Sequence, residues 1–130
     1  MTRQERADTA ANLKATGACN CCQAVTQVLA DTVDLDAETL KKLSSGFMAG
    51  MACGEATCGA LIGANIIAGL RTGGAGTAKV SRELLAKFKE KCGATVCRDL
   101  KGALTGKVLC ECPDCVRNAV LSLEELLPSA

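Results

Sequence analysis

The sequence predicts an all-α fold, a compact bundle of about five to six helices with a buried Gly/Ala-rich central helix. Apolar residues recur at spacings of three and four along most of the chain, which is the period of an α-helix. No segment shows the sustained alternation that is typical of strands. The chain has 130 residues and no segment that reads as a linker, so we expect a single domain over residues 1–130.

Two helices are expected in the first part of the chain. Residues 3–16 read as a polar helix that ends at Gly17, since glycine readily adopts the conformation that closes a helix. Residues 22–33 read as a second helix, with Val25, Val28 and Leu29 on its apolar face.

The middle of the chain predicts a third helix over residues 37–51 and a central helix over residues 58–70. The central helix is apolar almost throughout, but it is too short to span a bilayer. Each of these helices carries two glycines four residues apart, although an interior glycine costs about 1 kcal/mol relative to alanine. We expect the two glycine faces to meet, for close helix packing alone or for clearance around a cofactor. The glycines are Gly46 and Gly50, and Gly59 and Gly63.

The last part of the chain predicts a glycine-rich loop over residues 73–76 and then three helical segments. Residues 79–91 place apolar side chains on one face and charges on the other. A short helix is expected near Arg98, and a last helix over residues 113–127 begins with proline, which suits a first helical turn.

Composition excludes several classes of partner. The chain has 15 basic and 14 acidic residues, a net charge of +1, and only Phe47 and Phe88 as aromatic residues. It therefore offers neither a phosphate-neutralising patch nor a base-stacking surface, and we expect no nucleic-acid partner. The first eight residues mix charges and lack the apolar run of an export signal, so we expect a cytoplasmic protein without membrane insertion.

Cysteine is the one redox-capable side chain that the sequence offers in quantity. There are ten cysteines and no histidine, and the cysteines gather into four groups near expected helix ends. Cys58 follows Thr57 at the start of the central helix, where free backbone N–H groups stabilise a thiolate, so we expect an acidic thiol. The four groups are Cys19, Cys21 and Cys22; Cys53 and Cys58; Cys92 and Cys97; and Cys110, Cys112 and Cys115.

Four stretches of the chain resemble the C-GCAxxG-C-C family of redox-active proteins, over nearly its whole length. They are Asn20-Cys21-Cys22-Gln23-Ala24-Val25; Thr57-Cys58-Gly59-Ala60-Leu61-Ile62-Gly63-Ala64; Cys97-Arg98-Asp99-Leu100; and Cys112 followed by Val116 and Ala119. The resemblance implies a small helical redox module with four family cysteines, which here fall on Cys21, Cys58, Cys97 and Cys112.

The cofactor that this resemblance implies is an iron–sulfur cluster, either 2Fe-2S or 4Fe-4S, bound by those four thiolates. Thiolates from separate helix ends can hold such a cluster, and the cluster would then link the helices of the fold. The chain departs from the family pattern in its six additional cysteines. Cys22, Cys53, Cys110 and Cys115 are secondary ligand candidates, whereas Cys19 and Cys92, taken alone, read as small buried hydrophobic residues.

Two other functions stay open at this stage. The first is a metal-free thiol–disulfide oxidoreductase, in which Cys112 and Cys115 have the two-residue spacing of a reactive pair. The second is a Cu(I) or Zn thiolate protein, with Met48 or Met51 as further soft ligands for copper. A redox partner protein, a homodimer that shares ligands, and enzymatic activity also stay open, because an electron carrier need not transform a substrate.

Overall fold

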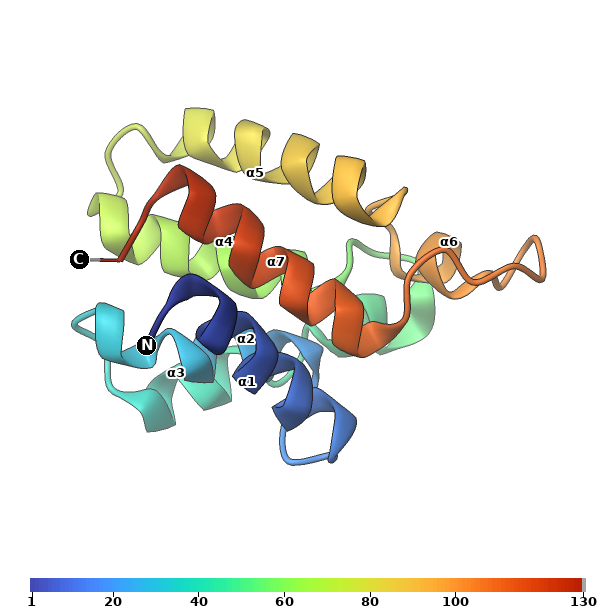
Figure 1. The fold of residues 1–130 in the computed structure, drawn as a ribbon, viewed down its shortest axis with the longest axis horizontal. Helices are drawn as coiled ribbons and strands as arrows, with labels where there is room; N and C mark the ends of the chain where they lie inside the picture. Colours follow the sequence, from blue (N-terminus) through green and yellow to red (C-terminus); the bar gives the residue numbers. More distant parts are fainter. Residues whose placement is uncertain (130) are drawn as a thin grey trace.

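The structure is a computed structural model that describes residues 1–129, and it confirms the all-α prediction (Figure 1). It has seven α-helices, slightly more than expected, and within these residues the only strand-type pairing is an isolated bridge. The elements are α1 Arg3–Ala15, α2 Cys21–Val28, the 3-10 turn η1 Ala30–Thr32, α3 Ala37–Leu43, the π-type turn η2 Gly50–Gly54, α4 Gly59–Thr72, α5 Thr77–Cys92, α6 Cys97–Lys101 and α7 Cys112–Leu126.

Helix α4 is the central helix of the bundle, and it packs against α2, α5 and α7. Its buried face consists largely of glycine and alanine, which allows neighbouring helices to approach closely. A methyl group at position 63 would lie 2.8 Å from the carbonyl oxygen of Cys22, so Gly63 is required for the contact with α2. The small residues of α4 therefore set its distance from α2.

Helices α1 and α7 pack along each other and cover one side of the bundle (Figure 1). The contact face of α1 is made of small residues, with Ala7, Ala10 and Ala11 buried. Helix α7 contributes the larger apolar side chains, including the fully buried Val120 and Leu123. This pairing brings the two ends of the sequence together and fixes the position of α7.

The expected helix over residues 37–51 is wrong in its second half, because α3 ends at Leu43. The hydroxyl of Ser44 is buried and contacts the hydroxyl of Thr26 at 2.8 Å, which fixes the chain where it leaves the helix. Residues 49–52 then all adopt positive φ angles of 48° to 62°, a region that non-glycine residues rarely occupy. The segment turns back on itself here instead of continuing as a helix.

The two glycine pairs do not meet as expected. Gly46 has open space around its Cα, while a methyl group at Gly50 would lie 2.7 Å from Cβ of Cys97. Gly50 thus permits close contact with α6, and Gly63 faces α2. Gly59 faces Cys21 at the start of α2 and also the backbone of Phe47 and Met48, in the segment between Gly46 and Gly50. The four-residue spacing correctly indicated close approach, but it did not indicate which elements approach each other.

A buried ionic cluster ties the helices together at one end of the bundle. Glu124 on α7 lies between Arg6 on α1, at 3.8 Å, and Arg71 on α4, at 3.4 Å. Arg6 also donates to the Val28 carbonyl and pairs with Asp31. Because each charge has a partner of opposite sign, the cluster offsets part of its desolvation cost.

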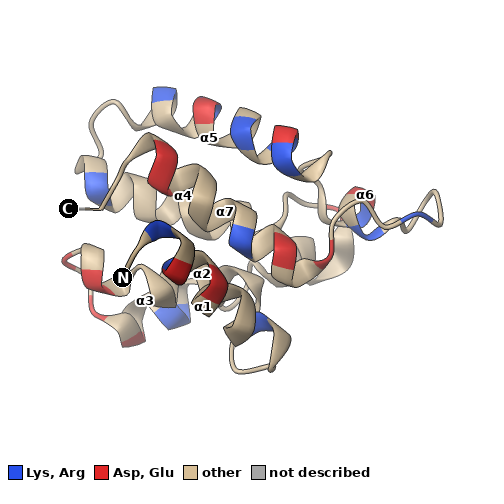
Figure 2. Ribbon diagram, viewed as in Figure 1, with Lys and Arg blue, Asp and Glu red and all other residues tan. Residues whose placement is uncertain are grey.

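The outer helix α5 carries interspersed basic and acidic residues on its visible face (Figure 2). Its opposite face buries Leu84 and Phe88 against the bundle. In the part of the chain that the structure describes, none of the helices combines the length and the apolar character needed to cross a membrane.

Candidate metal centre

Four cysteines from four different helix starts line one cavity of about 70 Å³. Cys21, Cys97 and Cys112 are the first residues of α2, α6 and α7, and Cys58 directly precedes α4. The first turn of a helix has free N–H groups and a positive partial charge, both of which stabilise a thiolate. The fold therefore directs four favourable helix ends toward a single small space.

Cys21 is positioned by the cap of α2. The side chain of Asn20 accepts a hydrogen bond from the N–H of Gln23 at 2.8 Å, and the side chain of Gln23 accepts one from the N–H of Asn20 at 3.1 Å. Burial raises the pKa of the Cys21 thiol, while the backbone N–H of Ala49 partly offsets this effect by donating to its sulfur. The unusual turn at residues 49–52 thus starts with a donor to a cavity thiol.

Cys58 and Cys97 are brought together by an antiparallel bridge between Thr57 and Val96. The N–H of Cys58 donates to the Thr95 carbonyl at 2.7 Å, and the N–H of Cys97 donates to the Ala56 carbonyl at 3.0 Å. These bonds join two segments about forty residues apart in the sequence. They fix the starts of α4 and α6 next to each other.

Cys112 is the half-buried member of the four, and the ammonium group of Lys101 contacts its sulfur. Burial lowers the pKa of Lys101, but the hydrogen bond and the charge of Cys112 outweigh it, so the net shift is upward. The N–H groups of Leu109 and Cys110 both donate to the carbonyl of Leu100, which brings the start of α7 back to α6.

The electrostatics differ among the four thiols. A hydrogen bond from Cys115, helped by the backbone N–H groups of Ala60 and Leu61, lowers the pKa of Cys58 to about 7. Burial raises the pKa of Cys97, and charges on the other cavity thiols raise it further, although Lys101 opposes them. The expected acidic thiol at Cys58 agrees with this environment, and the helix start is part of its cause.

The spacing of the four cavity sulfurs favours a cofactor of several atoms over a single metal ion. Among residues 1–129, only Cys92, Cys110 and Cys115 form a set of three or more candidate ligands with ligand atoms within 4.8 Å of one another. Thiolates on one tetrahedral ion with bonds of about 2.3 Å lie only about 3.8 Å apart. A water molecule takes up about 30 Å³ of liquid volume, so a cavity of about 70 Å³ has room for more than one atom. Four thiolates are the donor set that iron–sulfur clusters use.

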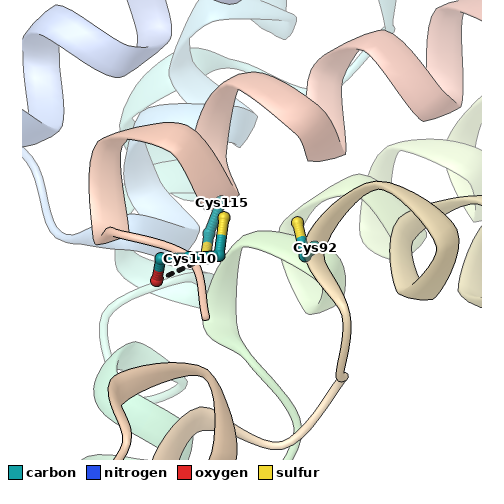
Figure 3. Close-up of side chains that lie close together, drawn as sticks. All are labelled: Cys92, Cys110 and Cys115. Atoms are coloured by element: carbon teal, nitrogen blue, oxygen red, sulfur yellow. Dashed lines mark hydrogen bonds between the residues drawn. The ribbon is translucent and has the colours of Figure 1, made fainter. Parts of the chain in front are cut away.

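Cys92, Cys110 and Cys115 form a second, buried group of thiols next to the cavity (Figure 3). Cys92 ends α5, Cys110 precedes α7, and Cys115 lies in the first turn of α7, where its thiol donates to the Cys110 carbonyl at 3.6 Å. The three sulfurs are close enough to bind a metal ion. Cys115 also lines the cavity, so it connects the two groups. We call Cys92, Cys110 and Cys115 the three-thiol group.

The pKa values in the three-thiol group diverge. Hydrogen bonds from Cys115 and Asn118 lower the pKa of Cys92 to about 6, while burial raises that of Cys110 to about 12. The pKa of Cys115 is also raised, because hydrogen bonds to Cys58 and Cys92 favour its protonated form and burial adds to this effect. These opposite shifts favour one thiolate, at Cys92, stabilised by the protonated thiols of its neighbours.

The remaining cysteines lie outside both groups. Cys22 is buried on α2, and desolvation raises its pKa to about 12. Cys53 is exposed in η2, with its sulfur 3.5 Å from the Gly50 carbonyl, and Cys19 is buried in the core. Among the secondary candidates, the structure therefore places Cys110 and Cys115 next to other thiols, but not Cys53.

The model of one protein family, described as "Putative redox-active protein (C_GCAxxG_C_C)", matches residues 19–126. The chain belongs to this family. The match includes all ten cysteines and confirms the resemblance that the four sequence stretches indicated. No curated protein and no solved structure is similar enough to the chain to give a match.

Membership of the C_GCAxxG_C_C family separates the cysteines of this chain into two sets. The four that carry the resemblance, Cys21, Cys58, Cys97 and Cys112, all line the cavity. The three-thiol group consists of additional cysteines, and sequence analysis did not anticipate that Cys92 belongs to it. Its spacing from Cys110 gave no signal, because the contact arises where the end of α5 meets the start of α7.

Proposed function

We propose that this chain is a small redox protein that binds one iron–sulfur cluster, 2Fe-2S or 4Fe-4S, through Cys21, Cys58, Cys97 and Cys112, and works in electron transfer. The observation that carries this proposal is the convergence of four thiols from four helix starts on one cavity. One chain supplies all four thiols, so no ligand needs to come from a second copy.

The surroundings of the cavity suit an anionic metal–sulfur group. Backbone N–H groups of Ala49, Ala60 and Leu61 are directed at cavity sulfurs, and Lys101 adds a positive charge beside Cys112. Such hydrogen bonds and charges set the reduction potential of iron–sulfur proteins. When bound, a cluster supplies one-electron oxidation and reduction. The residues of the chain hold it, neutralise its charge and restrict its contact with water.

An electron carrier needs a partner that reaches the cofactor. Met48 lines the cavity and its side chain is exposed, as is that of Met51 a few residues later. We place the docking of a redox partner protein at this face, where an exposed apolar side chain lines the cavity. We also place the protein in a reducing compartment such as the cytoplasm, where cysteines stay reduced and available as ligands.

A second candidate function is thiol–disulfide exchange without metal. It is favoured by Cys112, which is half-buried, contacts the Lys101 ammonium and lines the same cavity as Cys115. In this mechanism a Cys112 thiolate attacks a substrate disulfide and releases one substrate thiolate, and Cys115 then displaces the second substrate thiol as the Cys112–Cys115 disulfide forms.

Anaerobic purification followed by visible absorption, iron and acid-labile sulfide analysis tests the first proposal. We expect a brown protein with equal amounts of iron and sulfide, and the iron count distinguishes a two-iron from a four-iron cluster. Cys97→Ser should lose colour and most of its iron, whereas Cys53→Ser, outside both groups, should retain both. Colourless protein with exchange activity would support the second candidate, and zinc or copper without sulfide would support a simple metal thiolate site.

A further inference from the structure

The three-thiol group has the geometry of a site for one metal ion. Its sulfurs lie within 4.8 Å of one another, and the residues are only 4%, 8% and 1% exposed at Cys92, Cys110 and Cys115. Sulfurs bound to a single ion by bonds of about 2.3 Å lie about 3.8 Å apart, which is within this range. Thiolates that bind separate irons of a cluster would lie farther apart, so the group suits one ion better than a second cluster.

A polar side chain already supports the sulfurs of this group. The amide nitrogen of Asn118, one turn after Cys115 on α7, lies 3.4 Å from Sγ of Cys92 and 4.0 Å from Sγ of Cys110. A neutral amide that donates to two sulfurs stabilises them as thiolates, which is the ligating form. Such supporting donors orient metal ligands and typically change metal affinity 10- to 100-fold.

The site also has a route from solvent. A surface groove lined by Cys110, Asp114 and Asn118 opens beside the three-thiol group. The carboxylates of Glu111 and Asp114 line this groove and favour the approach of a cation, although Arg117 pairs with Asp114. The cavity of the four family cysteines is a different space, and Cys115 is the one residue that both spaces share.

We propose that Cys92, Cys110 and Cys115 form a second metal site that binds one thiophilic d10 ion, Cu⁺ or Zn²⁺, independently of the four-cysteine cavity. Each thiol that binds the ion releases its proton to solvent, and the ion forms one bond to each of the three sulfurs. Thiolate ligands select these ions over hard cations such as Mg²⁺. Three protein ligands complete a three-coordinate Cu⁺ site, whereas Zn²⁺ would take a fourth ligand from the water in the groove.

Metal titration of the full-length, reduced chain under anaerobic conditions tests this proposal. Zn²⁺ and Cu⁺ are added separately in the presence of a competing chelator, and bound metal is counted by elemental analysis. The titrations use Cys97→Ser, which disables the family cavity. We expect this variant to bind one equivalent of at least one ion. Adding Cys110→Ser to it should weaken that binding at least tenfold, while adding Cys53→Ser should leave it unchanged.

Asn118→Ala provides a milder test that does not remove a ligand. In the Cys97→Ser background it should weaken binding about 10-fold or more while the helical circular dichroism is retained. Cobalt(II) added in place of zinc should give the intense sulfur-to-metal absorption of thiolate coordination, and this band should disappear with Cys92→Ser.

Equal affinity in Cys97→Ser with and without Cys110→Ser would overturn the proposal, and so would the loss of all ion binding in Cys97→Ser alone. Either result leaves the iron–sulfur proposal to its own test of colour and sulfide.

Discussion

Cys58 and Cys97 enter the cavity from two segments whose backbones bind each other, since each cysteine N–H donates to a carbonyl on the opposite segment. The bridge between Thr57 and Val96 is the one pairing of this type in residues 1–129. It places two helix starts side by side through backbone hydrogen bonds. Such bonds preorganise the two thiols, which reduces the conformational entropy that cofactor binding would cost.

Gly59→Ala is expected to damage both stability and cofactor content. A methyl group at this position would lie 2.5 Å from Sγ of Cys21 and 2.7 Å from the carbonyl oxygen of Phe47, so α4 would have to move away from α2. We expect a loss of about 1–3 kcal/mol in the free energy of unfolding, together with reduced iron in purified protein. Denaturant unfolding and iron analysis measure the two effects.

Gly69→Ala is the matched control for this prediction. Gly69 lies on the same helix with no atom within 4 Å of the position that a methyl group would occupy. Alanine there should stabilise the helix by about 0.5–1 kcal/mol and leave the iron content unchanged. Equal behaviour of the two variants would mean that Gly59 does not provide clearance at the cavity.

The helix starts and the cysteines were the part of the site that the sequence could predict. Cys58 lies at the start of α4 and Pro113 in the first turn of α7 next to Cys112, as expected. Thr57 does not cap α4, because the N-cap residue is Cys58 and no side chain binds the first turn. The family resemblance selected the four thiols, and all four line the cavity. Their role as ligands remains a proposal.

The parts that sequence analysis missed depend on contacts between distant segments. Residues 44–52 continue an apolar period that suits a helix, but close packing of Gly50 on Cys97 favours a turn with positive φ angles instead. Cys92 reads as an ordinary buried residue until α5 is placed against α7. Neither feature has a signal in the spacing of neighbouring residues, because both arise from tertiary packing.

Asn20→Ala tests whether the cap of α2 positions Cys21 for cofactor binding in addition to stabilising the helix. Loss of the cap should cost about 1 kcal/mol of unfolding free energy, and it should also free the first turn that carries Cys21. Asp36→Ala removes the comparable cap of α3, whose helix start is not at the cavity. We expect similar losses of stability in the two variants, but reduced iron only in Asn20→Ala. Thermal unfolding and iron content distinguish them, and equal iron in both would contradict this role for the cap.

Lys101→Gln should lower the reduction potential of the bound cofactor. The Lys101 ammonium contacts the Cys112 sulfur, so its positive charge favours the more negative, reduced state. Solvent screens this charge, and we therefore expect a shift of about 30 mV, or about 0.7 kcal/mol for one electron. Lys107→Gln, an exposed lysine in the loop that follows α6, is the control and should leave the potential unchanged. A redox titration monitored by visible absorption measures both variants, and an unchanged potential in Lys101→Gln would argue against a cofactor ligand at Cys112.

Glu124 should make part of the stability depend on pH in the acidic range. Burial raises the pKa of its carboxyl group, but hydrogen bonds from Ser129 and the charge of Arg71 outweigh burial, so the net pKa lies below its ordinary value of 4.5. A carboxyl group with a lowered pKa in the folded state stabilises the protein fully above the unfolded-state pKa. This contribution is lost as the pH falls from about 4.5 through the folded-state pKa.

Glu124→Gln should therefore flatten the fall in stability below pH 4.5 and reduce stability at pH 7, because Arg6 and Arg71 lose their shared partner. Glu38→Gln, in an exposed pair with Lys42, should change neither. Urea unfolding of the three proteins between pH 3 and pH 7 provides the measurement, and parallel curves for wild type and Glu124→Gln would show that the buried pair does not set the acid limit of the fold.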